Sequence, residues 1–202
     1  MAVAGYVWFD AEFSSLELDN AVLLQVAAMV TDSHLKLLEN HTTSIEIAIK
    51  LDEKIIPSRW VSEHLNSLVD RCRGIDAVHI DDADKKLYTW LQLHFPADIK
   101  QMNERPILAG NSIHNDWFMV RKFLPNFNSK LNYRLLDVSS FKTGWDGMGK
   151  YESFDKSKLD LLNMYFPGPK IDKLEPHDAL FDIKASIAEM AYYYEKLGFN
   201  SI

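Results

Sequence analysis

The stretch YVWFDAE at residues 6–12 decides the fold. It begins as an apolar, aromatic run typical of a buried strand, and it ends with two acids, Asp10 and Glu12. Alternate side chains of an extended backbone point to the same face. The spacing therefore predicts two carboxylates in one place at the end of a buried strand.

Further strands are predicted after this stretch. The run VLLQVAAMVT at residues 22–31 has a strand-like composition, and a turn-like Thr-Asp-Ser cluster follows at 31–33. Residues 35–38 and the alternation SIEIAI at 44–49 predict one or two more strands that are half-buried. An antiparallel meander is the economical arrangement for this part of the chain.

The remainder of the chain alternates between helical and strand patterns. Helices are predicted from Pro57 to residue 68, over 81–95, over 113–124 up to Pro125, over 159–166 and over 178–196. Short strands at 106–109 and 135–138 alternate with them, and GWDGMG at 144–149 is predicted as a loop. This order predicts an α/β fold, with a mixed sheet flanked by helices, in a single domain over residues 1–202.

The composition excludes several classes of protein. Of 202 residues, 47% are hydrophobic and 25% charged, which excludes a disordered or collagen-like chain. The net charge of −7 has the wrong sign for binding long duplex DNA. No window approaches the roughly 18 apolar residues that span a membrane. The single cysteine, Cys72, and an N-terminus without a secretory pattern predict a reducing compartment, the cytoplasm or a similar one such as the mitochondrial matrix.

Two more acids fall within the apolar stripes of predicted helices. In the helix after Gly110, Asp116 lies in the stripe formed by Ile113, Trp117, Val120 and Leu124. In the last helix, Asp182 lies in the stripe formed by Ala179, Ile183, Ile187 and Met190. Both carboxylates are therefore predicted to face the core side.

These four acids together indicate a metal site. A single one is explained as a helix cap or as a buried hydrogen-bond acceptor. No Arg or Lys stands directly beside any of them in the sequence, so either distant basic residues or bound cations must compensate their charge. Because Mg²⁺ and Mn²⁺ prefer carboxylate and water ligands, the set favours a site for two divalent cations.

The acids and one histidine resemble the DEDDh superfamily of 3′→5′ exonucleases, through Asp10-Ala11-Glu12, Asp116 after GNSIHN at 110–115, and His177 five residues before Asp182. The similarity narrows to the oligoribonucleases through Trp60 with His64, the GNSI run, YRLLDVS at 133–139 and AEMAYY at 188–193. It covers most of the chain. The resemblance implies a ribonuclease H-like fold and a metal-dependent hydrolase that degrades short RNA to nucleoside 5′-monophosphates.

The resemblance also implies roles for single residues. Asp10, Glu12, Asp116 and Asp182 would hold two Mg²⁺ or Mn²⁺ ions. His177 would be the general base, since an imidazole accepts a proton near neutral pH; its alternative is an ordinary surface histidine. Tyr133 and Arg134 would bind the 5′ phosphate in the partner subunit's site of a homodimer.

Other candidate substrate contacts follow from residue type. Leu16 is expected to wedge between bases, and Trp60 with His64 to offer a stacking face, with core packing as the alternative for Leu16 and Trp60. Phosphate donors are expected among Asn111, Ser112 and Ser139, with helix capping as their alternative.

Several positions depart from the family pattern. Phe13-Ser14-Ser15-Leu16 replaces Met-Thr-Gly-Leu, Gln25 and Trp117 replace Glu and Arg, and residues 144–157 are longer than the family segment.

Two rival functions stay open: a related DEDDh exonuclease acting on longer single-stranded RNA or DNA, and a catalytically silent RNA-binding module on the same fold.

Overall fold

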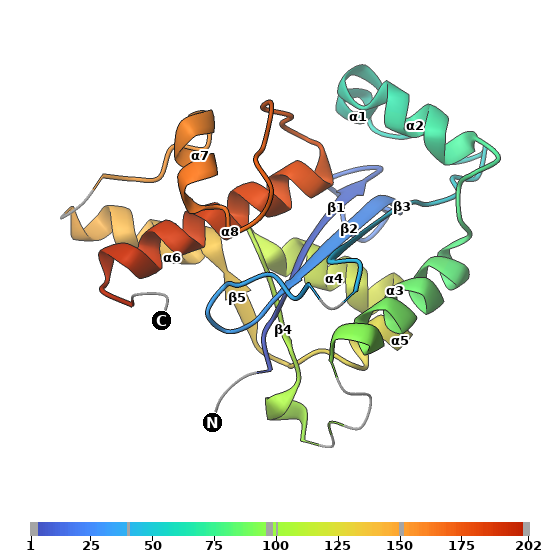
Figure 1. Ribbon diagram of the computed structural model, residues 1–202. Coiled ribbons are helices and arrows are strands. Elements are labelled where there is room, and N and C mark those ends of the chain that lie inside the picture. Colours follow the sequence, from blue (N-terminus) through green and yellow to red (C-terminus); the bar gives the residue numbers. More distant parts are fainter. Residues whose placement is uncertain (1–3, 40, 96–98, 100, 150–151, 200–202) are drawn as a thin grey trace.

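One mixed sheet organises the protein, with strand order β3-β2-β1-β4-β5 (Figure 1). The computed structural model describes residues 4–39, 41–95, 99, 101–149 and 152–199. The strands are β1 (Tyr6–Phe13), β2 (Leu23–Thr31), β3 (Ser44–Ala48), β4 (Ile107–Gly110) and β5 (Leu135–Asp137). β1, β2 and β3 pair antiparallel in a meander, whereas β4 and β5 extend the sheet in parallel from β1. The expected α/β class and the meander are confirmed.

The helices lie between and after these strands. They are α1 (Arg59–His64), α2 (Asn66–Arg73), α3 (Ile80–His94), the 3-10 turn η1 (Met102–Glu104), α4 (Ile113–Phe123), α5 (Pro125–Asn128), α6 (Val138–Met148), α7 (Leu159–Tyr165) and α8 (Ala179–Lys196). In the part of the chain that the structure describes, none of them is long and apolar enough to cross a membrane.

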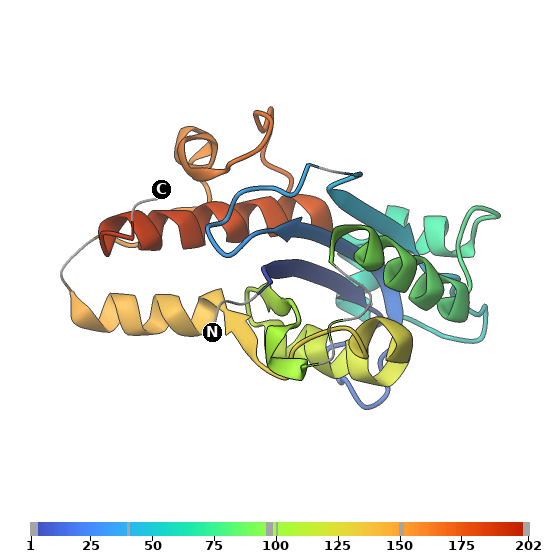
Figure 2. The same ribbon diagram turned by 60° about the horizontal axis from the view of Figure 1, so that its bottom comes forward.

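Helices cover both faces of the sheet, because β1 alternates its apolar side chains between them. Val7 and Phe9 belong to a core formed with α3, α4 and α5, while Tyr6 and Trp8 belong to a second core formed with α6, α7 and α8. Figure 2 shows α8 on one side of the sheet and α4 and α5 on the other. A smaller cluster around Leu24 attaches α1 and α2 to one end of the sheet.

The parallel pairing of β1 with β4 sets the location of the candidate site. It brings the carboxyl ends of the two strands to the same edge of the sheet, where α4 begins. Gly110 permits the close approach: a Cβ there would lie 2.7 Å from the Phe9 carbonyl oxygen. The end of β1 and the first turn of α4 therefore lie close together.

The loop predicted at residues 144–149 is wrong. Residues 144–148 are the last turns of α6, and Gly149 ends the helix with φ of 58°. The reason is tertiary packing: Trp145 is buried, lies 4.9 Å from the Tyr193 ring and donates to the Glu152 carbonyl at 3.2 Å. Burial of this indole outweighs the low helix propensity of the two glycines.

Three smaller expectations have different outcomes. The helix from Pro57 begins only at Arg59, after the Ser58 cap, and it breaks at Leu65, where φ of −120° is not helical. Of the one or two strands predicted over 35–38 and 44–49, one forms as β3, while residues 35–38 make a single bridge from Leu37 to Thr31. The helix predicted over 113–124 is confirmed: it ends at Phe123, just before Pro125, which then starts α5 because its fixed φ suits a first helical position.

Candidate active site

Four acids from three elements meet at the carboxyl end of β1. Asp10 and Glu12 lie on β1, Asp116 in the first turn of α4, and Asp182 in the first turn of α8. The backbone N–H of Ala11 donates to Asp116 Oδ1 at 3.0 Å, which ties α4 to the strand between the two β1 acids. The structure thus brings together all four acids that the sequence singled out.

The electrostatics of Asp10 and Asp116 show how close the acids lie. Burial raises the pKa of Asp10 well above its ordinary value, and the carboxylates of Asp116, Asp182 and Glu12 raise it further. Burial also raises the pKa of Asp116, although the hydrogen bond from Ala11 N–H opposes this. Burial and mutual repulsion therefore both disfavour the charged forms of these acids in the metal-free site.

Glu12 and Asp182 behave in the same way. Burial raises the pKa of Glu12 to about 7, with further contributions from Asp182 and Asp178. Burial raises the pKa of Asp182 as well, while the backbone N–H of His177 and the charge of Lys156 lower it. Mutual repulsion among buried carboxylates is the situation that a bound cation relieves.

The donor set fits hard divalent cations, because every candidate ligand is a carboxylate oxygen. Among the described residues, no group of three His, Cys, Asp or Glu side chains already has the arrangement of a metal site. The carboxylates are near enough to raise one another's pKa, and Asp10, Glu12, Asp116 and Asp182 are the residues that would hold such a cation.

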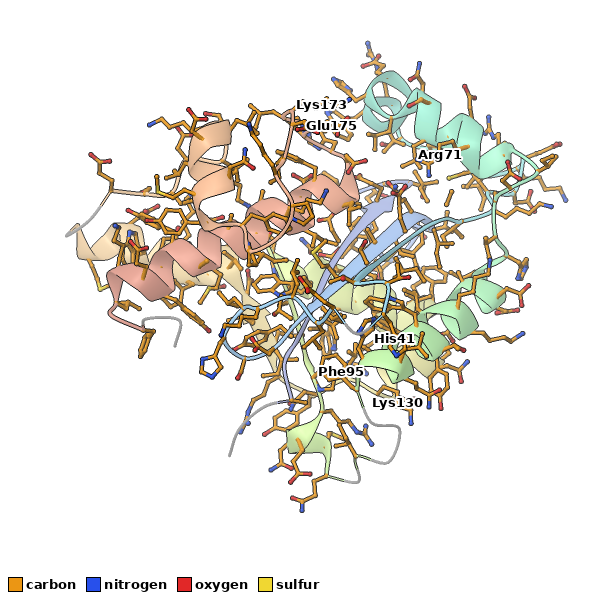
Figure 3. The ribbon with its side chains drawn as sticks, in the orientation of Figure 1. His41, Arg71, Phe95, Lys130, Lys173 and Glu175 are labelled. Atoms are coloured by element: carbon orange, nitrogen blue, oxygen red, sulfur yellow. The ribbon has the colours of Figure 1, made fainter. Side chains whose placement is uncertain are left out.

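His177 lies at the entrance to this cluster, on the loop that leads into α8. Its backbone has a φ of 68°, uncommon for a non-glycine residue, and its N–H donates to Asp182 Oδ2 at 3.0 Å. The imidazole is exposed. Earlier in the same loop, Lys173 Nζ lies 2.6 Å from Glu175 Oε1 (Figure 3). The loop thus presents a solvent-accessible imidazole beside a candidate metal ligand.

Aromatic rings of α1 extend the site beyond His177. The Trp60 and His64 rings stack at a centroid distance of 4.7 Å, and the Trp60 ring meets the His177 ring edge-on at 5.4 Å. Trp60 is 46% exposed, so core packing does not explain this tryptophan. The three rings form an accessible aromatic surface next to the acids.

Leu16 is placed differently from an ordinary core leucine. It is 91% exposed on the β1–β2 connection, so core packing is wrong for this residue too. The connection is anchored by Ser14, which is buried and whose Oγ accepts the N–H of Val22 at 3.0 Å. Ser14 is one of the departures from the family pattern, and its hydroxyl fixes the base of the loop that carries Leu16.

Asn111, Ser112 and Ser139 bond to one another and to their neighbours. The Ser112 N–H donates to Asp137 Oδ1 and to Ser139 Oγ, both at 3.0 Å, and Ser139 Oγ donates to Asn111 Oδ1 at 3.1 Å. The Asn111 amide donates in turn to Ser186 on α8. Helix capping, the alternative role for Ser112, is not seen within the described residues, because its hydroxyl accepts no backbone N–H of α4. The three residues join α4, α6 and α8 beneath the acids.

Tyr133 and Arg134 are outside the acidic cluster of this chain. They precede the edge strand β5, both are exposed, and the Arg134 guanidinium carbon lies 5.0 Å from the Tyr133 ring centre. Within one chain, the structure therefore leaves this pair on the surface.

Two other departures from the family pattern have local partners. Gln25 faces Glu12 across the β1–β2 ladder, and its amide donates to Glu46 Oε1 at 2.7 Å. A glutamate there would place another negative charge beside Glu12. Trp117 lies under Arg121, whose guanidinium carbon is 4.8 Å from the ring centre.

Sequence reasoning missed Lys156. Its ammonium group is near enough to Asp10 and Asp182 to lower the pKa of both, and it lies 3.0 Å from Glu189 Oε2. No local pattern signals this lysine, because the chain returns to the site through the connection between α6 and α7.

Comparisons with known proteins identify the family of this chain. A family model described as exonuclease matches residues 7–190. The chain is 32% identical over 191 residues to an oligoribonuclease of Rhodococcus jostii, covering 93% of this chain and 84% of that protein. It is 31% identical over 192 residues to a probable oligoribonuclease of Schizosaccharomyces pombe, covering 93% of this chain and 66% of that protein.

Solved structures share the fold at low identity. Zinc-bound E. coli exonuclease I in complex with single-stranded DNA superimposes with a TM-score of 0.69 at 12% identity, covering 97% of this chain but only 41% of that one. This likeness supports the expected ribonuclease H-like arrangement of sheet and helices. The family match and the relatives together show that this chain belongs to the exonuclease family, as an oligoribonuclease-like member of its DEDDh group.

Proposed function

We propose that the protein is a 3′→5′ exoribonuclease that hydrolyses short RNA and releases nucleoside 5′-monophosphates. The observation that carries this proposal is the meeting of Asp10, Glu12, Asp116 and Asp182 at one end of the sheet, with His177 beside them. The oligoribonuclease relatives favour short RNA as the substrate class.

In this proposal the four carboxylates hold two divalent cations, Mg²⁺ or Mn²⁺. When bound, the cations supply charge neutralisation at the phosphodiester and lower the pKa of the attacking water. The chain's own contribution is to hold acids of like charge in one buried place and to keep that place accessible on the His177 side.

His177 acts as the general base. Its exposed imidazole accepts a proton from the attacking water, and the hydrogen bond from its backbone N–H to Asp182 keeps the loop beside the metal ligands. Leu16 and Trp60 hold the 3′ end by wedging and stacking, with His64 behind the indole. Asn111, Ser112 and Ser139 contact phosphate in this proposal, and their mutual hydrogen bonds give them a structural role as well.

The proposal includes a homodimer. Tyr133 and Arg134 project from an edge of the sheet and pair with each other rather than with the acids of their own chain. An aromatic ring beside a guanidinium suits a terminal phosphate and base. In a dimer this pair would complete the partner's site and limit substrate length. The free, buried Cys72 is compatible with a reducing compartment such as the cytoplasm or mitochondrial matrix.

The test uses end-labelled RNA of two, five and twenty nucleotides, with Mg²⁺, with Mn²⁺ or with chelator. We expect the highest kcat/KM on the dinucleotide, products shortened from the 3′ end, and no hydrolysis in chelator. A preference for the twenty-nucleotide strand would favour the exonuclease on longer substrates. Metal-dependent binding without any hydrolysis would favour the silent module.

Mixed dimers test the trans arrangement. Asp116→Asn disables the metal site of its own chain, whereas Tyr133→Ala withdraws the tyrosine from the partner's site. Each homodimer should be weak, but subunit exchange should restore one good site in every heterodimer. If the mixture is no better than the average of the two preparations, or if the protein sediments as a monomer under assay conditions, the trans arrangement is wrong.

A further inference from the structure

A buried ion cluster lies on α8, about two helical turns from Asp182. Glu189 is fully buried, yet it is seven residues after Asp182 and so lies on the same face of the helix. Tyr193 donates its hydroxyl to Glu189 Oε1 at 2.8 Å, and two lysines approach the carboxylate, Lys156 at 3.0 Å and Lys142 at 3.7 Å. None of the roles described above uses this cluster.

The cluster carries more positive charge than Glu189 needs. One carboxylate meets two ammonium groups, and the Tyr193 hydroxyl satisfies one of its oxygens as well. One lysine with that hydroxyl is enough to compensate a buried carboxylate. The second lysine leaves a surplus of one positive charge, held at a fixed point by a buried anchor.

The surplus charge faces the active site. Lys156 Nζ lies 3.0 Å from Glu189 Oε2, and Glu189 lies two helical turns from Asp182 on the same face of α8. In agreement with this position, the charge of Lys156 lowers the pKa of Asp10 and Asp182, and its side chain remains 32% exposed. An ammonium group has three N–H donors, and only Glu189 lies within ion-pair distance of this one in the described structure. Lys156 can therefore donate further hydrogen bonds to a ligand bound at the four acids.

The charge balance of the proposed reaction gives these donors a use. Two divalent cations neutralise four carboxylates, so a phosphodiester in the loaded site still brings an uncompensated negative charge. We propose that Lys156, fixed by Glu189, binds a phosphate oxygen of the nucleotide at the acidic site. This inference rests on the proposed function and adds a substrate contact to it.

Four single variants test the contact. Lys156→Met removes the charge and keeps most of the side-chain volume, and Lys156→Arg keeps the charge. Lys158→Met is the matched control, since Lys158 is two residues away, is 68% exposed and pairs only with Asp155 in the described structure. Lys142→Met removes the other lysine of Glu189 without touching the acidic side.

We expect Lys156→Met to raise KM for the dinucleotide about tenfold and to weaken inhibition by a nucleoside 5′-monophosphate by a similar factor, as for a lost charged hydrogen bond. Lys156→Arg should stay within about threefold of wild type, as should Lys158→Met. Lys142→Met should lower the melting temperature but leave product inhibition within about threefold of wild type, because Lys142 pairs with Glu189 and does not contact the nucleotide.

Mn²⁺ titration without RNA separates this contact from simple charge balance. If Lys156 only offsets the acids, Lys156→Met will bind Mn²⁺ more tightly and be inhibited by product as strongly as wild type, which would overturn the proposal. If Lys156→Met does not fold, the doubly neutral Lys156→Gln/Glu189→Gln protein replaces it and should show the same tenfold loss. A wild-type protein without nuclease activity would instead refute the proposed function, and direct binding of the monophosphate would still report on Lys156.

Discussion

Two buried aspartates, Asp84 and Asp116, differ in what surrounds them. Asp84 on α3 accepts hydrogen bonds from the Asn126 N–H at 2.9 Å, the Asn126 side-chain amide at 2.8 Å and the Phe127 N–H at 2.8 Å. Asp116 accepts a backbone hydrogen bond from Ala11 but faces the charge of Glu12. A buried carboxylate surrounded by donors stabilises the fold, whereas one that faces other carboxylates stores repulsion for a cation to relieve.

The largest expected effect comes from the same substitution made at the two positions. Asp116→Asn should lower kcat/KM on the order of a thousandfold or more, since it removes a metal ligand, and chelator should do the same to wild type. Asp84→Asn should retain wild-type kcat/KM within about threefold. Initial rates on a labelled dinucleotide at saturating Mg²⁺ measure both. An Asp116→Asn protein with wild-type activity would remove Asp116 from the metal site.

His177→Ala extends the comparison to a group that is exposed. Loss of a general base lowers kcat about 10²- to 10⁴-fold and has little effect on ground-state binding. Single-turnover rates together with product inhibition separate these two quantities. His64→Ala is a useful contrast, because it removes a ring of the proposed stacking surface and should raise KM rather than lower kcat. A near-normal kcat for His177→Ala would identify His177 as an ordinary surface histidine.

The free energy of unfolding should depend on Asp84 more than on Asp116, the reverse of the order expected for kcat/KM. Asp84→Asn replaces an acceptor with an amide that faces three donors, so the free energy of unfolding should fall by about 1–3 kcal/mol. Asp116→Asn relieves repulsion in the metal-free protein, so its free energy of unfolding should equal or exceed that of wild type. Urea unfolding in chelator measures both. Equal losses at the two positions would show that their surroundings do not distinguish them.

The sequence was sufficient for features that depend on local periodicity. Strand alternation places Asp10 and Glu12 together, and helical spacing places Asp116 and Asp182 on inward faces, so these four acids were predictable. The burial of Asp84 was not predictable, because Asp81 and Asp82 precede it in the same helix and nothing local distinguishes the three acids. Only the fold brings Asn126 and Phe127 to it.

Contacts between distant segments account for the other differences. The glycines of residues 144–149 suggest a loop, but the burial of Trp145 against α8 keeps the segment helical. Trp60 falls on an apolar stripe, yet it is exposed, and its ring contacts His177 from the distant loop before α8. Lys156 and Glu189 are more than thirty residues apart in sequence and meet only after α7 and the His177 loop have folded onto α8.

The smallest expected effect is the pH dependence of the metal-free protein. Glu12 has an ordinary pKa of 4.5, which burial and neighbouring acids raise to about 7 in the folded state. Below about pH 4.5 the group is protonated in both the folded and the unfolded state, so it adds no pH dependence to the free energy of unfolding. Between pH 4.5 and 7 the unfolded chain releases this proton while the folded protein retains it, so the free energy of unfolding falls as pH rises and levels off above 7.

In chelator, the melting temperature should therefore drop by a few degrees from pH 5 to pH 8. Asp116→Asn should reduce the drop, because Asp116 is itself a buried acid whose pKa is raised in the folded state, whereas Asp84→Asn should leave it unchanged. Saturating Mn²⁺ should reverse the trend, because cations bind the deprotonated carboxylates. A melting temperature in chelator that rises steadily from pH 5 to pH 8 would show that the acids do not repel one another in the folded state.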